Sequence, residues 1–406
     1  MSRYASLLLL FGAIVSGGCG PEDPADNIPL SGDPTLPRPS TVHTLPDEEL
    51  AEGWISLFDG ETLFGWEAAS TADWRVEEGA IVASSGEKGL LCTPSPFENY
   101  ELHLEFKAPA ATNSGVFLRT PAKPTDPAVD CYELNIAGEG VSPFTTGGLV
   151  GREKTELTPP ADGDWHTFDV TVDGDKVAIR LDGAEALNYT AEPPLPAGFI
   201  GLQFNEGEIR FRNVKLRPLG LESIFNGKDL TGWKEPAENV SEFTVTEEGL
   251  LNVKNGRGYL ESEQAYGDFA LQFECRTNAA ALNSGMFFRT VPGSAMDGYE
   301  CQIHNGLKEG DRTKPADCGT GGFFRRQDAR YVPADDQTWF HLTLIAHGPH
   351  MAAWVNGYQV SDWTDTRPPH ANPREGLRLE PGTLQIQGHD PTTDIDFRGL
   401  RIVEVE

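Results

Sequence analysis

The segment NSGVFLRT, at Asn113–Thr120, recurs almost unchanged as NSGMFFRT at Asn283–Thr290. Both segments are rich in the aromatic and branched residues that favour β-strands. Successive side chains of a strand point to opposite faces, so Asn283, Gly285, Phe287 and Arg289 are expected on one face. A glycine within that row leaves room for a ligand to approach the sheet. The pair of segments therefore predicts one strand that occurs twice in the chain.

Further motifs recur in the same order on both sides of this strand. FDGETLFGW at Phe58–Trp66 matches FNGKDLTGW at Phe225–Trp233, at an offset of 167 residues, and the offset is 174 for the later Thr-Gly-Gly motif at residues 146 and 320. The rising offset places insertions in the second copy, which we expect mainly between residues 304 and 320. Two copies of this size predict two domains, at residues 51–218 and 219–406.

The segments between the motifs alternate apolar and polar residues, as in Tyr100–Phe106 and Phe340–Ile345. Turn pairs such as Asp182-Gly183 and Asn356-Gly357 separate them. The only helical stretches expected are short pieces such as Asp47–Glu52. Many short strands with frequent turns predict an all-β chain of two tandem jelly-roll sandwiches.

Composition narrows the classes of partner. The 406 residues carry a net charge of −30, with 44 Gly and 30 Pro. So acidic a chain should repel nucleic acid and anionic membranes, and it favours a neutral over an anionic ligand. There is no GxGxxG phosphate loop and no GxSxG elbow, which argues against nucleotide enzymes and serine hydrolases.

The amino-terminal residues 1–19 have the pattern of a secretory signal peptide, with an apolar stretch followed by small residues before Cys19. These small residues resemble a lipoprotein cleavage site, so Cys19 is expected to be lipidated, although ordinary cleavage beside an incidental cysteine is the alternative. Residues 20–50 are rich in proline and predict a semi-rigid tether. We therefore expect an exported lipoprotein of the cell envelope, attached to a membrane only through its lipid.

Five cysteines remain in the rest of the chain, so at least one is a free thiol. Cys275–Cys301 and Cys301–Cys318 are both conceivable disulfides, and the spacing does not choose between them. No zinc-binding spacing is present.

Polar residues alternate along GYECQIHNG at residues 298–306, which places Glu300, Gln302 and His304 on one face of a strand. Such a row of amide, carboxylate and imidazole groups suits sugar hydroxyls. The alternative is a solvated outer face with an Arg–Glu ion pair. The candidate substrate-binding set, taken over both copies, is Arg289, Gln302, Asn283, Arg326, Glu133, Asn135, Arg119 and Arg152.

Glu300 and His304 are the candidate catalytic residues, and together they could hold a divalent metal ion. The first copy is expected to have Asn135 where the second has His304, so the two copies should differ in activity. Arg152 aligns with Arg326, which makes that arginine a shared candidate. Lys314 and Arg325 lie near the same strand end and could close over a ligand, or could simply be solvated.

As an ordered set, these motifs resemble the 3-keto-disaccharide hydrolase family. The resemblance rests on FNGKDLTGW, NSGMFFRT, GYECQIHNG, GTGG, WVNG and DFRGLRI in the second copy, and on FDGETLFGW, NSGVFLRT, CYELN and FRNVKL in the first. It extends over nearly everything from Trp54 to Glu406. It implies a concanavalin-like jelly roll in each copy and action on glycosides oxidised at carbon 3 of the sugar.

A 3-keto group acidifies the proton on C2, so a base can remove it and the group on C1 can leave by elimination. For this chemistry the resemblance implies Glu300 or His304 as the base, with Arg289, Arg326 and Gln302 as orienting residues or partners of the enolate oxygen. The alternatives are a non-catalytic pair of carbohydrate-binding modules and a purely structural surface protein.

Overall fold

The computed structural model describes residues 42, 44–158 and 163–405. The predicted signal peptide, Cys19 and nearly all of the tether lie outside the described residues and stay predictions. In the described part, the first helix is α1 (Asp47–Glu52), the short helix expected from the sequence, so the helix includes the last residues of the segment predicted as a tether. No helix of the described residues has the length and apolarity needed to cross a membrane.

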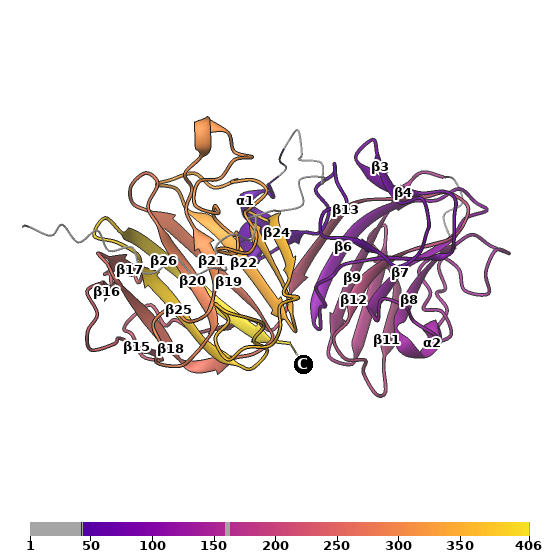
Figure 1. Cartoon of the computed structure of the whole chain (residues 1–406). Coiled ribbons are helices and arrows are strands. Elements are labelled where there is room, and N and C mark those ends of the chain that lie inside the picture. The colour runs from indigo at the N-terminus through magenta and orange to yellow at the C-terminus, as the bar shows by residue number, and fades with distance from the viewer. Residues whose placement is uncertain (1–41, 43, 159–162, 406) are drawn as a thin grey trace, which may run out of the picture. The chain divides into compact units, whose positions relative to one another are not determined.

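The first sandwich consists of two antiparallel sheets (Figure 1). The first sheet has the order β11 (Ala184–Thr190), β10 (Lys176–Leu181), β9 (Trp165–Asp173), β6 (Tyr100–Lys107), β13 (Ile209–Pro218), β4 (Ala80–Ala83) and β3 (Arg75–Glu77), with β1 (Ile55–Ser56) on β13. The second sheet has the order β2 (Glu67–Ala68), β5 (Gly89–Cys92), β12 (Phe199–Glu206), β7 (Asn113–Thr120) and β8 (Tyr132–Ala137). The short helix α2 (Pro127–Asp130) precedes β8.

The second sandwich repeats this plan. The third sheet has the order β16 (Glu242–Val245), β17 (Leu251–Lys254), β26 (Asp394–Glu404), β19 (Phe269–Thr277), β22 (Phe340–His347), β23 (His350–Val355) and β24 (Tyr358–Thr364), with β14 (Glu222–Ser223) on β26. The fourth sheet has the order β15 (Trp233–Lys234), β18 (Gly258–Tyr266), β25 (Gly382–Gly388), β20 (Ser284–Thr290) and β21 (Tyr299–Ile303). A 3₁₀ turn, η2 (Lys308–Gly310), follows β21. The all-β fold class with two sandwiches is thereby confirmed.

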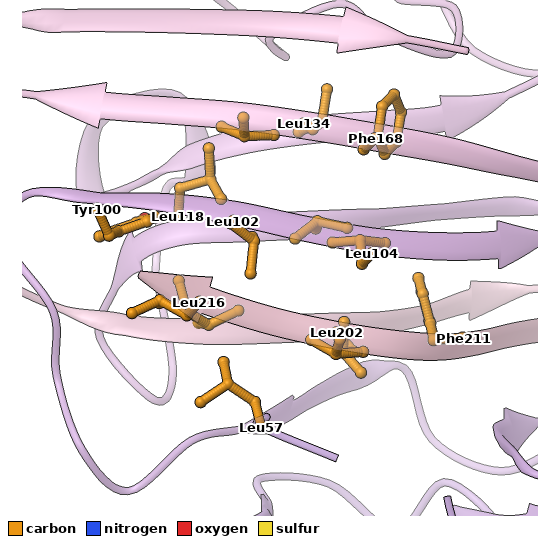
Figure 2. Packing of buried hydrophobic residues seen from close by; sticks show 14 of the residues in the cluster. Leu57, Tyr100, Leu102, Leu104, Leu118, Leu134, Phe168, Leu202, Phe211 and Leu216 are labelled. Atoms are coloured by element: carbon orange, nitrogen blue, oxygen red, sulfur yellow. The ribbon is translucent and has the colours of Figure 1, made fainter. Parts of the chain in front are cut away.

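Strand alternation builds the core of each sandwich. Along β6 every second residue is buried, beginning with Tyr100, and these side chains meet those of the facing sheet, such as Leu118, Leu134 and Leu202 (Figure 2). Burial of large apolar side chains of this kind contributes about 1.5–3 kcal/mol each. In the second sandwich the corresponding cluster includes Tyr299, Cys301 and Ile303 of β21. Residues between these positions must therefore point to the outer face of the sheet.

The five described cysteines are all buried free thiols, so neither Cys275–Cys301 nor Cys301–Cys318 forms a disulfide. Burial raises the pKa of Cys301, and that of Cys92 to about 12, so these thiols stay protonated. They act as small apolar residues in the packing.

Candidate functional site

The outer face of the fourth sheet carries two rows of side chains across neighbouring strands. In the first row, Glu261 of β18 pairs with Gln385 of β25, which pairs with Phe287 of β20, which pairs with Glu300 of β21. In the second row, Tyr259 pairs with Gln387, and Gly285 pairs with Gln302. We call this surface the site face and define it by Glu261, Glu300, Gln302, Gln385 and Gln387. The expected alternation of Glu300 and Gln302 against the core residues is observed.

The site face is covered rather than open to solvent. Glu300 is 6% exposed and Gln302 is 1% exposed. Part of the cover is the segment around Met296, whose backbone N–H donates to Gln385 Oε1 at 2.8 Å. A buried polar layer is costly unless its groups have partners, so this arrangement is unlike a solvated outer face.

Gly285 gives Glu300 its space. A Cβ atom at residue 285 would lie 2.8 Å from Glu300 Oε1 and 3.0 Å from Glu300 Cγ, closer than packed atoms allow. The glycine predicted to leave room on the sheet therefore makes room for the carboxylate of the neighbouring strand.

Arg374 is the cation that contacts Glu300. Its Nη2 lies 3.3 Å from Glu300 Oε2, its Nε donates to the Met296 carbonyl at 3.1 Å, and its guanidinium lies 5.2 Å from the centre of the Phe287 ring. Arg374 belongs to the loop of residues 365–381 between β24 and β25, whereas the first sandwich has only residues 191–198 at this place. The contact joins a guanidinium that is 32% exposed to a carboxylate that is 6% exposed.

Burial raises the pKa of Glu300 to about 7. The charge of Arg374 opposes this rise, Asp317 adds to it, and Arg325 opposes it more weakly. A carboxylate whose pKa lies near neutral pH is better suited to accept a proton from carbon than an ordinary glutamate, because general bases work best near the operating pH.

Amide oxygens near Glu300 have no hydrogen-bond partner among the described residues. They are Gln302 Oε1 and Gln387 Oε1. Asn283 Oδ1 is also without a partner, but Asn283 precedes β20 at the end of the strand pair where His304 lies. The amide nitrogens are used: Gln302 Nε2 donates to the Asp317 carbonyl at 3.0 Å, and Gln387 Nε2 donates to Met296 Sδ at 3.1 Å. With the nitrogens held, the oxygens are left to accept from a ligand, and hydroxyl groups are suitable donors.

His304 lies one residue beyond β21, at the end of the predicted row. Its Nδ1 accepts the Gly306 backbone N–H at 3.1 Å, and its own backbone N–H donates to Thr320 Oγ1 at 2.9 Å. Four residues of extended chain place its Cα about 13 Å from that of Glu300. His304 is therefore at the rim, and Glu300 is in the covered layer.

Glu300 and His304 are not placed to hold one metal ion together. Glu300 already pairs with Arg374, and its distance from His304 along the strand does not suit two ligands of one ion, which need bonds near 2 Å. Within residues 42, 44–158 and 163–405 no group of three or more His, Cys, Asp and Glu side chains is placed to hold a metal. The predicted metal site at Glu300 and His304 therefore does not fit the placement of these two side chains.

Arg289 and Arg119 do not lie on the outer faces where alternation placed them. Arg289 has a φ of 47° and sits where the pairing of β20 with β25 shifts register, so its side chain leaves the row of Phe287. It is 0% exposed, pairs with Asp268 at 2.6 Å and donates to the Gly348 carbonyl at 2.6 Å. Arg119 also has a φ of 47° and binds the carbonyls of Glu98 and Leu195. Both arginines tie loops together, which corrects their expected role in binding substrate.

Arg326 supports the loop that carries Arg374. Its Nη2 donates to the Arg374 carbonyl at 2.7 Å, and burial lowers its pKa to about 10. Its counterpart Arg152 donates to the Cys131 carbonyl at 3.0 Å and lies over the Tyr132 ring. Of the two other candidates, Lys314 pairs with Glu309, whereas Arg325 is close enough to influence Glu300.

The first sandwich has the same two rows with different residues. Cys92, Gly201, Phe117 and Glu133 form one, and Leu90, Gln203, Gly115 and Asn135 form the other. Asn135 pairs with Gly115 as Gln302 pairs with Gly285, so Asn135 corresponds to Gln302. The expectation that Asn135 replaces His304 is thus wrong by two residues. The residue of the first sandwich at the position of His304 is Ala137.

The sequence comparison with protein families matches this chain twice. Residues 53–217 and 220–403 each match the family described as the 3-keto-alpha-glucoside-1,2-lyase-like domain. A 3-keto-disaccharide hydrolase of Bacteroides thetaiotaomicron is 34% identical over 79 residues, which cover 16% of this chain and 27% of that protein. The match therefore spans about a quarter of that relative.

Solved structures with a similar fold include a candidate glycosyl hydrolase from Parabacteroides distasonis, at 22% identity and a TM-score of 0.39, which covers 44% of this chain and 100% of that one. A carbohydrate-binding module from Bacillus subtilis is 15% identical at a TM-score of 0.31, covering 42% of this chain and 95% of that module. The two family matches together cover most of the sequence, so the chain belongs to the 3-keto-alpha-glucoside-1,2-lyase-like family and carries two copies of its domain.

Proposed function

We propose that the second sandwich cleaves glycosides whose sugar carries a ketone at C3, with Glu300 as the base that removes the C2 proton. The observation that carries the proposal is the pairing of a buried carboxylate, whose pKa burial raises to about 7, with the guanidinium of Arg374. Membership of a family named for action on 3-keto-glucosides supports the substrate class.

The reaction divides into three steps. Glu300 takes the C2 proton, and the electron pair of that C–H bond forms the C2=C3 double bond of an enolate. The enolate then collapses, so that the C3 ketone re-forms, a C1=C2 double bond appears and the C1–O bond to the aglycone breaks. The departing oxygen takes up the proton that Glu300 removed, which regenerates the carboxylate. Water then adds across the C1=C2 bond, and the net result is hydrolysis.

The residues of the site face have matching tasks in this scheme. Arg374 is the cation beside Glu300 and would stabilise the negative charge that develops on the C3 oxygen. Gln302 Oε1 and Gln387 Oε1 would accept hydrogen bonds from sugar hydroxyls and orient the ring relative to Glu300. A neutral sugar suits a protein with a net charge of −30.

The test is aglycone release from an aryl 3-keto-glucoside, with nuclear magnetic resonance in D₂O to follow deuterium entering at C2. We expect release together with exchange at C2. The unoxidised glucoside is the matched control and should be inert, because its C2 proton is not acidic. Release without any involvement of the C2 proton would rule out the elimination route, and a complete absence of release would rule out the activity.

The same assay with and without EDTA examines the metal prediction. From the donors present we expect release to continue after exhaustive dialysis against EDTA. Loss of activity that Mn²⁺, Ca²⁺ or Zn²⁺ restores would instead establish a metal, held by donors other than the Glu300–His304 pair.

The pH dependence should move when Arg374 is replaced. The base acts deprotonated, so kcat/KM of the wild type should fall as the pH drops below about 7. Arg374 lowers the pKa of Glu300, so Arg374→Met should shift this limb to higher pH and reduce the rate at neutral pH. The loop-matched control is Arg378→Met, since Arg378 donates to the Ala371 carbonyl instead. An unchanged limb in Arg374→Met would show that another group titrates.

A second candidate function, sugar binding without turnover, has specific support in the first sandwich. Glu133 occupies the position of Glu300 but contacts the neutral amide of Gln203 at 3.2 Å, and no salt bridge to it is present among the described residues. This difference between the copies leads to the inference that follows.

A further inference from the structure

The two outer faces share a small set of residues at matched positions. Glu133 and Glu300 each pair with a phenylalanine of the neighbouring strand, Phe117 or Phe287. Two residues along that strand, Gly115 and Gly285 each face the next polar residue of the glutamate strand. The glutamine on the far side of the glycine is also shared, as Gln203 in the first sandwich and Gln387 in the second. The same arrangement of glutamate, phenylalanine, glycine and glutamine is therefore present twice.

The shared glutamines have the same unmet hydrogen-bonding capacity. Gln203 Oε1 and Gln387 Oε1 are both buried atoms with no partner among the described residues, and Asn205 Oδ1, two residues along β12, is a third. Gln203 Nε2 is held by Glu133 Oε1, so its oxygen remains to accept. Buried acceptors without a partner are uncommon in folded proteins. Their recurrence at one position of two divergent copies points to a ligand that donates hydrogen bonds.

The first sandwich has a counterpart of the proposed base, Glu133, but lacks the loop that carries the cation Arg374. The loop that supplies Arg374 is replaced by residues 191–198, and Arg152, the aligned arginine, binds the Cys131 carbonyl instead of Glu133. Burial raises the pKa of Glu133 to about 7, and only a hydrogen bond from a neutral amide opposes this. A base could thus form here, but among the described residues no salt bridge supplies Glu133 with a cation that would stabilise an enolate.

The floor of the first face is also less polar. Cys92 and Gly201 stand at the positions of Glu261 and Gln385. Leu90, Cys92, Phe117, Cys131 and Phe199 form an apolar cluster of their own, apart from the core between the sheets. Four members of this cluster are buried, and Phe199, which is only partly buried, is the one that a ligand can reach. Apolar contact at Phe199 beside hydroxyl acceptors suits a sugar with an apolar substituent, since such sites combine apolar contact with a few fixed polar groups.

We propose that the outer face of the first sandwich, centred on Gly115, Glu133 and Gln203, is a non-catalytic binding site for a neutral glycoside with an apolar aglycone. The sugar hydroxyls donate to Gln203 Oε1 and Asn205 Oδ1, and the aglycone packs against Phe199. The assignment to glycosides rests on the proposed function of the family domain. A binding site beside a catalytic site in one chain raises the local concentration of substrate.

The experiment counts binding sites on the full chain by calorimetry. The protein carries Glu300→Gln so that ligand is not consumed, and the probes are phenyl and methyl 3-keto-α-glucoside. We expect two sites per chain for the phenyl glucoside. Adding Gln203→Leu should remove one site, or weaken it about tenfold or more through loss of an acceptor. Gln387→Leu, its matched partner in the second sandwich, should affect the other site.

Further readouts separate binding from turnover and from misfolding. Asn205→Leu serves as a second variant if Gln203→Leu fails to fold, and the methyl glucoside should bind the first site more weakly than the phenyl glucoside. One site per chain that Gln203→Leu leaves untouched would overturn the inference. Glu300→Gln protein that still releases aglycone would do so as well, because the first sandwich would then be catalytic. If wild-type protein binds at two sites but releases nothing, the proposed activity fails while this inference stands.

Discussion

Replacement of Glu300 by glutamine is expected to lower kcat for release of the aglycone by about 10²–10⁴-fold, the usual contribution of a general base. Glutamine keeps the shape of the side chain and the contact with Arg374 but cannot take a proton. Because the loss arises in the chemical step, kcat should fall while KM changes little. The measurement is steady-state release of 4-nitrophenol from its 3-keto-glucoside, with circular dichroism to show an intact fold.

The same substitution should raise stability at alkaline pH. The pKa of Glu300 is about 7 in the folded protein against an ordinary value of 4.5, so the folded state binds more protons than the unfolded state between those pH values. Stability that Glu300 supplies is therefore present at low pH and lost as the pH rises toward 7. Glutamine has no such loss, so at pH 8 the variant should gain up to about 3 kcal/mol in free energy of unfolding. A variant that is inactive and also less stable at pH 8 would indicate a structural role for Glu300.

The second large effect is expected at Arg289. Arg289→Met should lower the free energy of unfolding by about 3 kcal/mol, near the lower end for breaking a buried ion pair, because Asp268 is itself partly exposed. The substitution removes the Arg289 donor from Asp268 Oδ1 and from the carbonyls of Gly267 and Gly348, while Asp268 Oδ2 keeps the Gly348 N–H. Urea unfolding followed by tryptophan fluorescence gives the value.

A surface pair provides the comparison for this measurement. Lys254 lies 3.6 Å from Asp394, and the two side chains are 50% and 36% exposed. Lys254→Met should change stability by about 1 kcal/mol or less, as exposed pairs do. At a temperature where Arg289→Met is folded, its kcat/KM should fall at low pH in the same way as that of the wild type, because Arg289 does not contact Glu300. A shift in the pH dependence of kcat/KM would show that Arg289 acts on the site after all.

The sequence predicted the parts of the fold that depend on local pattern. The period-two alternation in Tyr100–Lys107 and Tyr299–Ile303 gave the correct faces, since a strand leaves only two directions for a side chain. The rule failed at Arg119 and Arg289 because a residue with positive φ interrupts the alternation. Nothing in the letters NSGVFLRT signals that backbone, because arginine rarely adopts it.

Arg374 was missed because it lies far from Glu300 in sequence and belongs to a loop without pattern. A signal was nevertheless present: the offset between the copies is 174 residues at Gly183 and Gly357, but 186 at Phe211 and Phe397. The larger insertion of the second copy thus lies after residue 357, not between residues 304 and 320 as expected. Glu261, Gln385 and Gln387 were missed because only the pairing of strands brings them beside Glu300.

The loop of residues 365–381 has a consequence for how a duplicated domain diverges. If one insertion carries the arginine that separates a catalyst from a binder, then the cation that the proposed chemistry needs depends on a single connection between strands. Strand-to-strand connections tolerate insertions well, because they lie at the ends of a sandwich and leave its core intact. After duplication, one copy could thus bind ligand without turnover while the other copy gained or kept catalytic activity. Inserting residues 365–381 between β11 and β12 would test whether this one change gives the first sandwich catalytic activity.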